Sequence, residues 1–387
     1  MKDVLVKDKK CKYSKYCGGC TLQGFSYDKQ LDKKQEYIEK LLGKLHKVNR
    51  IIGMDNPLNY RNKVQVTFGH DDKNNIICGN FISSTHIIVP IDECMIADEK
   101  ANEIIDTVKS LAVKYRISVF DEDSLKGCLR HVQIRVSSSN EYMVILVTGS
   151  NTIPKGDLLV RDLLKNHKEI KTIVQNINRR HTSMVLGDRN IVLFGKGYIY
   201  DNLCSLNFKL SASSFYQVNK RQTEVLYNTA LALADFSKED TVIDAYCGIG
   251  TIGLITANKV KNVIGVELNK QAIRDAIYNS KLNDITNAYF VCDDAGHYMQ
   301  RLSKEKKRID SVIMDPPRSG ADIKFLNSLV QLKPKKILYI SCGPESLKSN
   351  LLYLTKNGYR INTIQPVDMF PFTDHVETVV LMSRDKE

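Results

Sequence analysis

The sequence predicts an α/β protein in which a parallel sheet, with helices on both faces, follows a mixed α+β region. The first observation is a regular alternation of strand-like and helix-like runs from about residue 240. The second is the chain length of 387 residues, which corresponds to two or three domains. The strand-like runs of the second half are 241–246, 262–267, 287–292, 310–315, 335–341, 359–366 and 375–383.

The first half of the chain lacks this alternation. A helix is expected over 27–42, although Leu31, Tyr37 and Ile38 follow helical spacing only loosely. Further expected elements are a strand at 63–68, a helix at 101–116, a hairpin formed by 131–136 and 142–148, and strands near 171–177, 183–186 and 190–194. We therefore expect three parts: a cysteine-rich segment and helix (1–50), a central α+β domain (51–208) and an α/β catalytic domain (209–387).

Composition limits the class of protein. Hydrophobic residues are 43% and charged residues 26%, which excludes a disordered chain. No apolar run reaches the roughly 18 residues that a membrane helix needs. Because the first residues are too mixed in charge for a secretory signal, we expect a soluble, cytoplasmic protein.

The charge of the chain indicates a partner. Lys and Arg number 56 against 44 Asp and Glu, a net charge of +12, and residues 1–50 alone hold 13 basic and 6 acidic side chains. An excess of this kind suits a polyanion such as nucleic acid. The alternative is a generally lysine-rich proteome, which charge alone does not exclude.

A glycine-rich turn follows the first strand of the α/β region. The strand 241–246 contains Asp244, ends at Tyr246 and continues into Cys247-Gly248-Ile249-Gly250, and the next strand ends at Glu267. Such glycines let a ligand approach the backbone, and a carboxylate at that strand end can accept two ribose hydroxyls. The third glycine of the dinucleotide fingerprint is missing, so the pattern is closer to the S-adenosylmethionine site of Rossmann-like methyltransferases. The alternative is a tight turn in an ordinary α/β domain.

The fourth strand of this region ends in Asp315-Pro316-Pro317-Arg318. Ligands of open α/β sheets bind at the carboxyl ends of the strands, and the prolines stiffen this loop around Asp315. Enzymes that methylate amino groups of bases carry an aromatic residue after the prolines. Here Arg318 takes that place, which argues against methylation of adenine or cytosine amino groups.

The end of the fifth strand supplies a candidate nucleophile. Cys342 follows this strand and directly precedes a predicted helix, whose N-terminus would favour a thiolate. A lone cysteine can equally be a buried structural residue, but its place at the site edge favours reactivity.

The last strand-like run contains a second candidate. Glu377 interrupts an apolar run, and a buried acid is costly unless it is used or paired; the alternative is a solvated outer-face glutamate. His375 is interpreted first as a packing or hydrogen-bonding histidine, with a proton shuttle as the alternative.

These motifs together resemble the RNA uracil-5-methyltransferase family, in order and over nearly the whole chain. The matching stretches are 214–219 (Ser-Phe-Tyr-Gln-Val-Asn), 244–250, 315–318, 341–344 and 375–378. The resemblance implies that Cys342 is the nucleophile and Glu377 the base. It further implies that S-adenosylmethionine lies among Gln217, Tyr246, Glu267, Asp293 and Asp315, that Asp315 also contacts the uracil edge, and that Phe215 stacks near a flipped base.

The first three cysteines, Cys11, Cys17 and Cys20, together with the distant Cys94, supply four thiolates. By spacing alone they could bind zinc or an iron–sulfur cluster. The resemblance to iron–sulfur members of the family implies ligands of a 4Fe-4S cluster with a structural role. Only ten residues precede Cys11, so we expect the small β RNA-binding domain of many members to be absent.

The resemblance implies transfer of a methyl group from S-adenosylmethionine to carbon 5 of a uridine through a covalent Cys342–uracil intermediate. A thiolate adding to carbon 6 makes carbon 5 nucleophilic, and a base then removes its proton. The expected partner is RNA, 23S ribosomal RNA first and the T-loop of transfer RNA second, with no membrane and no obligate protein partner. The alternative of another class is a non-catalytic iron–sulfur RNA-binding protein.

Overall fold

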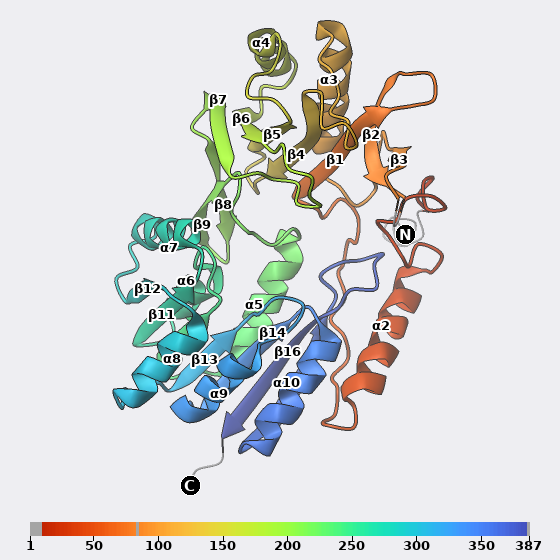
Figure 1. Cartoon of the computed structure of the whole chain (residues 1–387). Coiled ribbons are helices and arrows are strands. Elements are labelled where there is room, and N and C mark those ends of the chain that lie inside the picture. Colours follow the sequence, from red (N-terminus) through yellow and green to blue (C-terminus); the bar gives the residue numbers. More distant parts are fainter. Residues whose placement is uncertain (1–9, 83–84, 385–387) are drawn as a thin grey trace.

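The computed structural model describes residues 10–82 and 85–384. They form two seven-stranded sheets, one from each half of the chain, with helices packed against both (Figure 1). A hairpin of β8 (Tyr198–Leu203) and β9 (Leu206–Ser211) lies between the two sheets. No helix within the described residues is long and apolar enough to cross a membrane.

The sheet of the first half has the order β3-β2-β1-β4-β5-β6-β7, and its neighbours are antiparallel except for β5 and β6. Alternate side chains of β1, Val64, Val66 and Phe68, pack on one face against α3 (Glu99–Tyr115) and α4 (Gly156–Asn166). The strands are β1 (Lys63–His70), β2 (Ile76–Phe81), β3 (Ile88–Pro90), β4 (Leu129–Val136), β5 (Tyr142–Thr148), β6 (Ile170–Ile177) and β7 (Arg189–Gly195).

The sheet of the second half has the order β12-β11-β10-β13-β14-β16-β15, and β16 alone runs against its neighbours. The strand order reverses direction at β10, which is where open α/β sheets bind ligands. The strands are β10 (Thr241–Ala245), β11 (Asn262–Glu267), β12 (Ala288–Cys292), β13 (Ser311–Met314), β14 (Lys336–Ser341), β15 (Tyr359–Val367) and β16 (Glu377–Arg384).

Helices cover both faces of this second sheet, as the sequence predicted. One face packs on α5 (Lys220–Ala234), α6 (Thr251–Ala257) and α7 (Lys270–Leu282). The other packs on α8 (Ala295–Lys304), α9 (Ile323–Leu332), α10 (Pro344–Lys356) and α2 (Tyr27–Leu42). Successive residues of one strand alternate between the two cores, since Val242 faces the first and Ile243 the second.

The predicted strands of the second half are confirmed to within one or two residues, and the helix predicted over 27–42 is α2. The strand predicted at 183–186 is wrong. The side-chain amide of Asn178 donates to the carbonyls of Met184 and Val185 at 2.7 and 3.0 Å, and so takes acceptors that a strand ladder would use. Helix α5 had not been predicted.

Helix α2 packs on the second half of the chain, although it lies near the N-terminus. Ile38 and Leu42 are completely buried in the core that α10 also lines. Lys34 forms a 2.6 Å ion pair with Asp368, whose side chains are 2% and 0% exposed. The hydroxyl of Tyr27 also donates to Asp368, at 2.8 Å. Residues 27–42 are therefore part of the α/β unit.

The buried ion pair gives a stability prediction. Lys34→Met leaves the Asp368 carboxylate buried without its cation, which costs about 3 kcal/mol of unfolding free energy. The matched control is Asp32→Asn, which breaks the Arg50–Asp32 ion pair, whose side chains are 61% and 55% exposed. Loss of this exposed pair should lower the unfolding free energy by less than about 1 kcal/mol. Urea unfolding measures both changes, and equal losses would contradict the proposed role of the buried pair.

Candidate active site

A glycine-rich turn joins β10 to α6. Tyr246, Gly248 and Gly250 all have positive φ values, of 66°, 55° and 84°. A Cβ at Gly248 would meet no atom within 4 Å, whereas one at Gly250 would approach Phe290 and Ala276 at 3.1–3.3 Å. Gly250 is thus required for packing, while Gly248 borders open space in which a ligand can approach the backbone.

Two carboxylates border this turn. Glu267, at the end of β11, accepts from the backbone N–H groups of Gly248 (3.3 Å) and Asn269 (2.8 Å). Asp244 on β10 is buried beside α6, where the backbone N–H of Gly253 approaches its carboxylate. Burial, reinforced by the charge of Asp315, raises the pKa of Asp244 to about 8.

The remaining predicted cofactor residues lie at nearby strand ends or in an adjoining segment. The backbone N–H of Asp293, just after β12, donates to the Glu267 carbonyl (3.2 Å), and its carboxylate pairs with Arg301 (3.1 Å). The Gln217 carbonyl accepts from Asn62 Nδ2 at 3.1 Å. Two residues earlier, the ring of Phe215 is 68% exposed. An exposed ring of this size is free to stack on a base.

Three reactive side chains come from adjacent strands at one edge of the sheet. Asp315 follows β13, Cys342 follows β14, and Glu377 begins β16. Because β16 is antiparallel to β14, its first residue lies beside the carboxyl end of β14, with Ser341 opposite Thr378. The topology therefore brings together residues that are more than sixty positions apart in sequence.

The electrostatics of this edge differ from the prediction for Cys342. Burial and the carboxylates of Glu377 and Asp315 raise the pKa of the Cys342 thiol to about 11, against the opposing effect of Arg318. Burial and the two carboxylates thus outweigh the expected thiolate-favouring effect of the following helix. Burial also raises the pKa of Glu377 to about 8, with Asp315 adding to the shift, and raises that of Asp315 to about 7.

A pocket of about 420 Å³ opens beside Cys342. Arg318 and His375 line it, and an Arg318 Nη atom lies 3.2–3.3 Å from the two ring nitrogens of His375. Lys33, Lys34 and Tyr37 of α2 form another wall. Sequence analysis did not place α2 at the site, because no motif of 27–42 signals contact with a strand end more than 300 residues away.

Comparisons with known proteins agree with this geometry. The pattern of the family described as tRNA (uracil-5-)-methyltransferase matches residues 26–385. An uncharacterized RNA methyltransferase of Bacillus cereus is 40% identical over 384 residues, which cover 98% of this chain and 83% of the relative. The chain belongs to the RNA (uracil-5-)-methyltransferase family. It is an S-adenosylmethionine-dependent RNA methyltransferase, which confirms the predicted enzyme class.

A solved structure extends the comparison to three dimensions. The Pyrococcus abyssi tRNA (uracil-54, C5)-methyltransferase in complex with S-adenosyl-L-homocysteine is 29% identical to our methyltransferase, with a TM-score of 0.78. The match covers 95% of this chain and 86% of that protein. The two enzymes therefore share the fold of both halves.

The predicted four-cysteine metal site is not found as a formed site. No group of three or more His, Cys, Asp or Glu side chains among residues 10–82 and 85–384 is arranged to hold a metal ion. The thiols are nevertheless neighbours: Cys11, Cys20 and Cys94 border one apolar cluster, and burial and the nearby Cys94 raise the pKa of Cys20 to about 12. The Cys17 thiol accepts from Asn80 Nδ2 at 3.6 Å.

The charges around Cys342 give a prediction that does not depend on catalysis. Glu377→Gln removes a carboxylate that raises the thiol pKa, so the variant should be alkylated by iodoacetamide faster than wild type at pH 9. Arg318→Gln removes a cation that lowers this pKa and should be alkylated more slowly. Half a pKa unit changes the thiolate fraction about threefold.

Mass spectrometry of the Cys342 peptide measures these alkylation rates. The exposed Cys292 in the same samples is the internal control, and its rate should be equal in all three proteins. Identical Cys342 rates in wild type and both variants would show that these two side chains do not set the thiol pKa.

Proposed function

We propose that this methyltransferase methylates carbon 5 of a uridine in RNA through a covalent bond between Cys342 and carbon 6 of the base. The observation that carries the proposal is the convergence of Cys342, Glu377 and Asp315 at the ends of three adjacent strands. The reaction needs one nucleophile, one carboxylate base and a cofactor pocket beside both. The family and the carbon-5 activity named for the Pyrococcus abyssi enzyme support the same chemistry.

The chain's residues fit S-adenosylmethionine at the edge of this site. We assign Glu267 to the ribose hydroxyls, because its carboxylate lies at the end of β11 beside the open space at Gly248. Tyr246, Asp293, Gln217 and Asp315 complete the binding residues. When bound, the cofactor supplies an electrophilic methyl group on a positively charged sulfur.

In the proposed reaction, the Cys342 thiol first gives its proton to solvent through the adjoining pocket, and Arg318 is the cation that lowers the pKa of this thiol. The Cys342 sulfur then bonds to carbon 6, and the electron pair of the 5,6 double bond makes carbon 5 nucleophilic. Carbon 5 takes the methyl group, with S-adenosylhomocysteine as the leaving group. Glu377, as a carboxylate, removes the carbon-5 proton, the double bond re-forms, and the carbon–sulfur bond to Cys342 breaks.

The uridine must leave any stem or stack to reach Cys342. Phe215 is our candidate for stacking near the flipped uridine, because its side chain is exposed and lies two residues before Gln217. Asp315 is assigned to the uracil edge as well as to the cofactor. With a pKa raised by burial to about 7, it can donate a proton to a hydrogen bond.

Two RNA targets remain proposals. The motif resemblance favours a uridine of 23S ribosomal RNA, whereas the neighbour named for uracil-54 of tRNA favours the T-loop. Mapping 5-methyluridine in both RNAs, in a strain lacking this protein and in its parent, separates them. Loss of one site in 23S RNA supports the first target, loss at position 54 of tRNA supports the second, and loss at neither contradicts carbon-5 methylation by this chain.

A 4Fe-4S cluster held by Cys11, Cys17, Cys20 and Cys94 is a further proposal. It rests on the resemblance to iron–sulfur members of the family, and it is supported by Cys11, Cys20 and Cys94 bordering one apolar cluster, with Cys17 close enough to affect the pKa of Cys20. Iron and sulfide analysis of anaerobically purified protein tests it directly. Zinc in place of iron would contradict the assignment.

The catalytic assignment predicts opposite defects for two variants. Cys342→Ala should form no covalent RNA adduct and transfer no methyl group, because the first bond is lost. Glu377→Gln should form the adduct and accept the methyl group but fail to release it, because the amide cannot take the carbon-5 proton. Denaturing gels with methyl-labelled cofactor distinguish a methylated protein–RNA adduct from free methylated RNA.

Cys204→Ala is the matched control for the loss of a cysteine, since Cys204 lies in the turn between β8 and β9, away from the strand ends that form the proposed site, and should leave turnover unchanged. Wild-type turnover by Glu377→Gln would remove Glu377 as the base. In that case His375 becomes the next candidate for the base. Separately, an adduct formed by Cys342→Ala would refute the mechanism at its first step.

A further inference from the structure

Three cations gather where β1 and β4 meet the segment that leads into the catalytic domain. Lys63 opens β1, and its Cα partner across the ladder is Arg135 of β4. Arg61 lies two residues before Lys63. Burial, reinforced by the charges of Arg135 and Arg61, lowers the pKa of Lys63 to about 8. The three side chains therefore lie close enough to repel one another.

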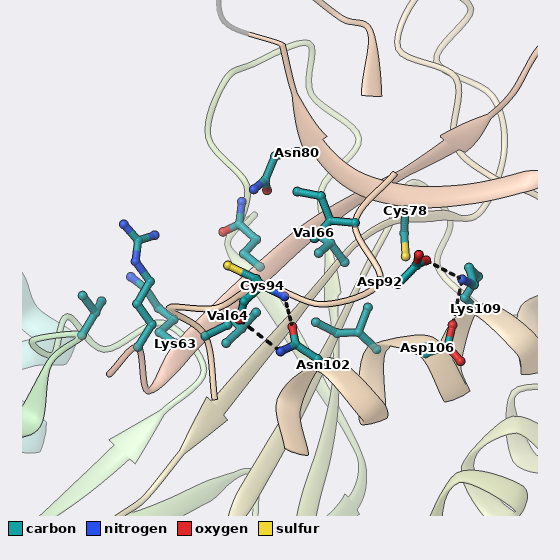
Figure 2. Close-up of a pocket in the computed structure, with 16 residues that line it drawn as sticks. Lys63, Val64, Val66, Cys78, Asn80, Asp92, Cys94, Asn102, Asp106 and Lys109 are labelled. Atoms are coloured by element: carbon teal, nitrogen blue, oxygen red, sulfur yellow. Dashed lines mark hydrogen bonds and ion pairs between the residues drawn. The ribbon is translucent and has the colours of Figure 1, made fainter. Parts of the chain in front are cut away.

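No carboxylate in the described part of the chain forms an ion pair with any of these cations. Arg61 and Lys63 line a pocket of about 270 Å³ that also contains Asp92 and Asp106 (Figure 2). Both acids are instead directed to Lys109, at 3.8 and 2.7 Å, as the dashed lines in Figure 2 show. One end of the pocket is thus electrically balanced, and the end with Arg61 and Lys63 carries uncompensated positive charge.

Beside this pocket, on Arg61 and on β4, three donor atoms have no hydrogen bond within the described part of the chain. The Nε atoms of Arg61 and Arg135 and the Nε2 atom of the adjacent Gln133 are buried without a hydrogen bond. Arg135 is only 6% exposed. A buried cation with unused donors is costly for folding, so its presence points to an anionic ligand that takes these hydrogen bonds.

The position of these cations points to the kind of anion. Arg135 Nη2 donates to the carbonyl of Ser214 (2.5 Å), and Asn62, between Arg61 and Lys63, donates to the carbonyls of Gln217 and Val218. The segment 214–218 thus links the cations to Phe215. A strand of RNA whose base reaches Phe215 carries a phosphate on each side of that nucleotide.

We propose that Arg61, Lys63 and Arg135 bind a backbone phosphate of the RNA substrate, next to the nucleotide that enters the active site. The inference rests on RNA as the substrate and adds a specific anchoring site for its backbone. Planar guanidinium groups suit phosphate oxygens, and the ammonium of Lys63 adds a point charge. The alternative role is structural: Arg61 also faces the thiols of Cys20 and Cys94 and can act as their counter-charge.

Salt-dependent RNA binding tests the site. The probe is a fluorescein-labelled single-stranded oligouridylate, and anisotropy gives Kd over a range of KCl concentrations without cofactor. Lys63→Gln should weaken binding about fivefold near 0.1 M salt and reduce the slope of log Kd against log salt by about 0.7, the value for one phosphate contact on a single strand. Lys63→Arg keeps the charge and should retain the wild-type slope.

The matched control is Lys165→Gln, which removes an exposed lysine of α4, on the far side of the central domain from the catalytic sheet (Figure 1). It should leave the slope unchanged. Arg61→Gln is a second variant, on a residue outside β1, and should reproduce the reduced slope if Lys63→Gln fails to fold. A wild-type slope in both variants, or an equal loss in the Lys165 control, overturns the proposal.

Methyl transfer separates this inference from the proposed function. With saturating RNA, Lys63→Gln should retain kcat within about twofold while KM for RNA rises, because a phosphate contact binds ground state and transition state alike. A fall in the kcat of Lys63→Gln without a change in RNA affinity would indicate that Lys63 has a structural role and would refute the phosphate site. If the wild-type protein binds the oligonucleotide but methylates no uridine at carbon 5, the proposed function is refuted. The salt slopes of the Lys63 and Arg61 variants would still test the phosphate site.

Discussion

The active site depends on the buried carboxylate of Asp368. Asp368 is completely buried between β15 and β16 and receives Lys34 at 2.6 Å and the Tyr27 hydroxyl at 2.8 Å. Lys34 also donates to the Phe370 carbonyl at 3.1 Å, so one cation holds two points of the loop that leads to Glu377. An unpaired charge at this depth would be strongly destabilising. The loop and helix α2 must therefore pack together for either to be stable.

This pairing gives the N-terminal helix a place in the catalytic half of the molecule. Lys33, Lys34 and Tyr37 form a wall of the pocket beside Cys342, and the hydroxyl of Tyr37 donates to Glu345 in the first turn of α10. The cysteine segment that precedes α2 is consequently anchored near the same edge of the sheet, since the backbone N–H of Leu22 donates to the Phe372 carbonyl at 2.9 Å. Residues from both ends of the chain build one site.

Opposite charge patterns distinguish the two sites that RNA is proposed to reach. At the sheet edge, burial and two nearby carboxylates raise the pKa of the Cys342 thiol. At the junction with the central domain, three cations form no ion pair with a carboxylate of residues 10–82 and 85–384. A nucleotide bound between these regions would present its phosphate to the cations and its base to the thiol. Its negative backbone would be held away from Glu377 and Asp315, whose charges would repel it.

The sequence alone determined the architecture of the second half. Strand-like runs of six to nine residues, alternating with helix-like runs, predicted its strands, because the strands of a sheet covered on both faces are largely apolar. It also indicated Asp315, Cys342 and Glu377 individually, because each directly follows or interrupts such a run. Ligand sites of these folds lie at strand ends, so position within the local pattern was enough to nominate them.

Tertiary structure decided what local patterns cannot encode. The apolar spacing of α2 is loose because its buried face includes Gln30, Lys34 and Gln35, whose polar groups find partners far along the chain. Burial, and carboxylates that only strand pairing brings close, oppose the expected effect of the helix N-terminus on the pKa of Cys342. The cation group at Lys63 likewise exists because β1 and β4 pair in one register. Long-range pairing sets these electric fields, and no spacing within a single segment reports them.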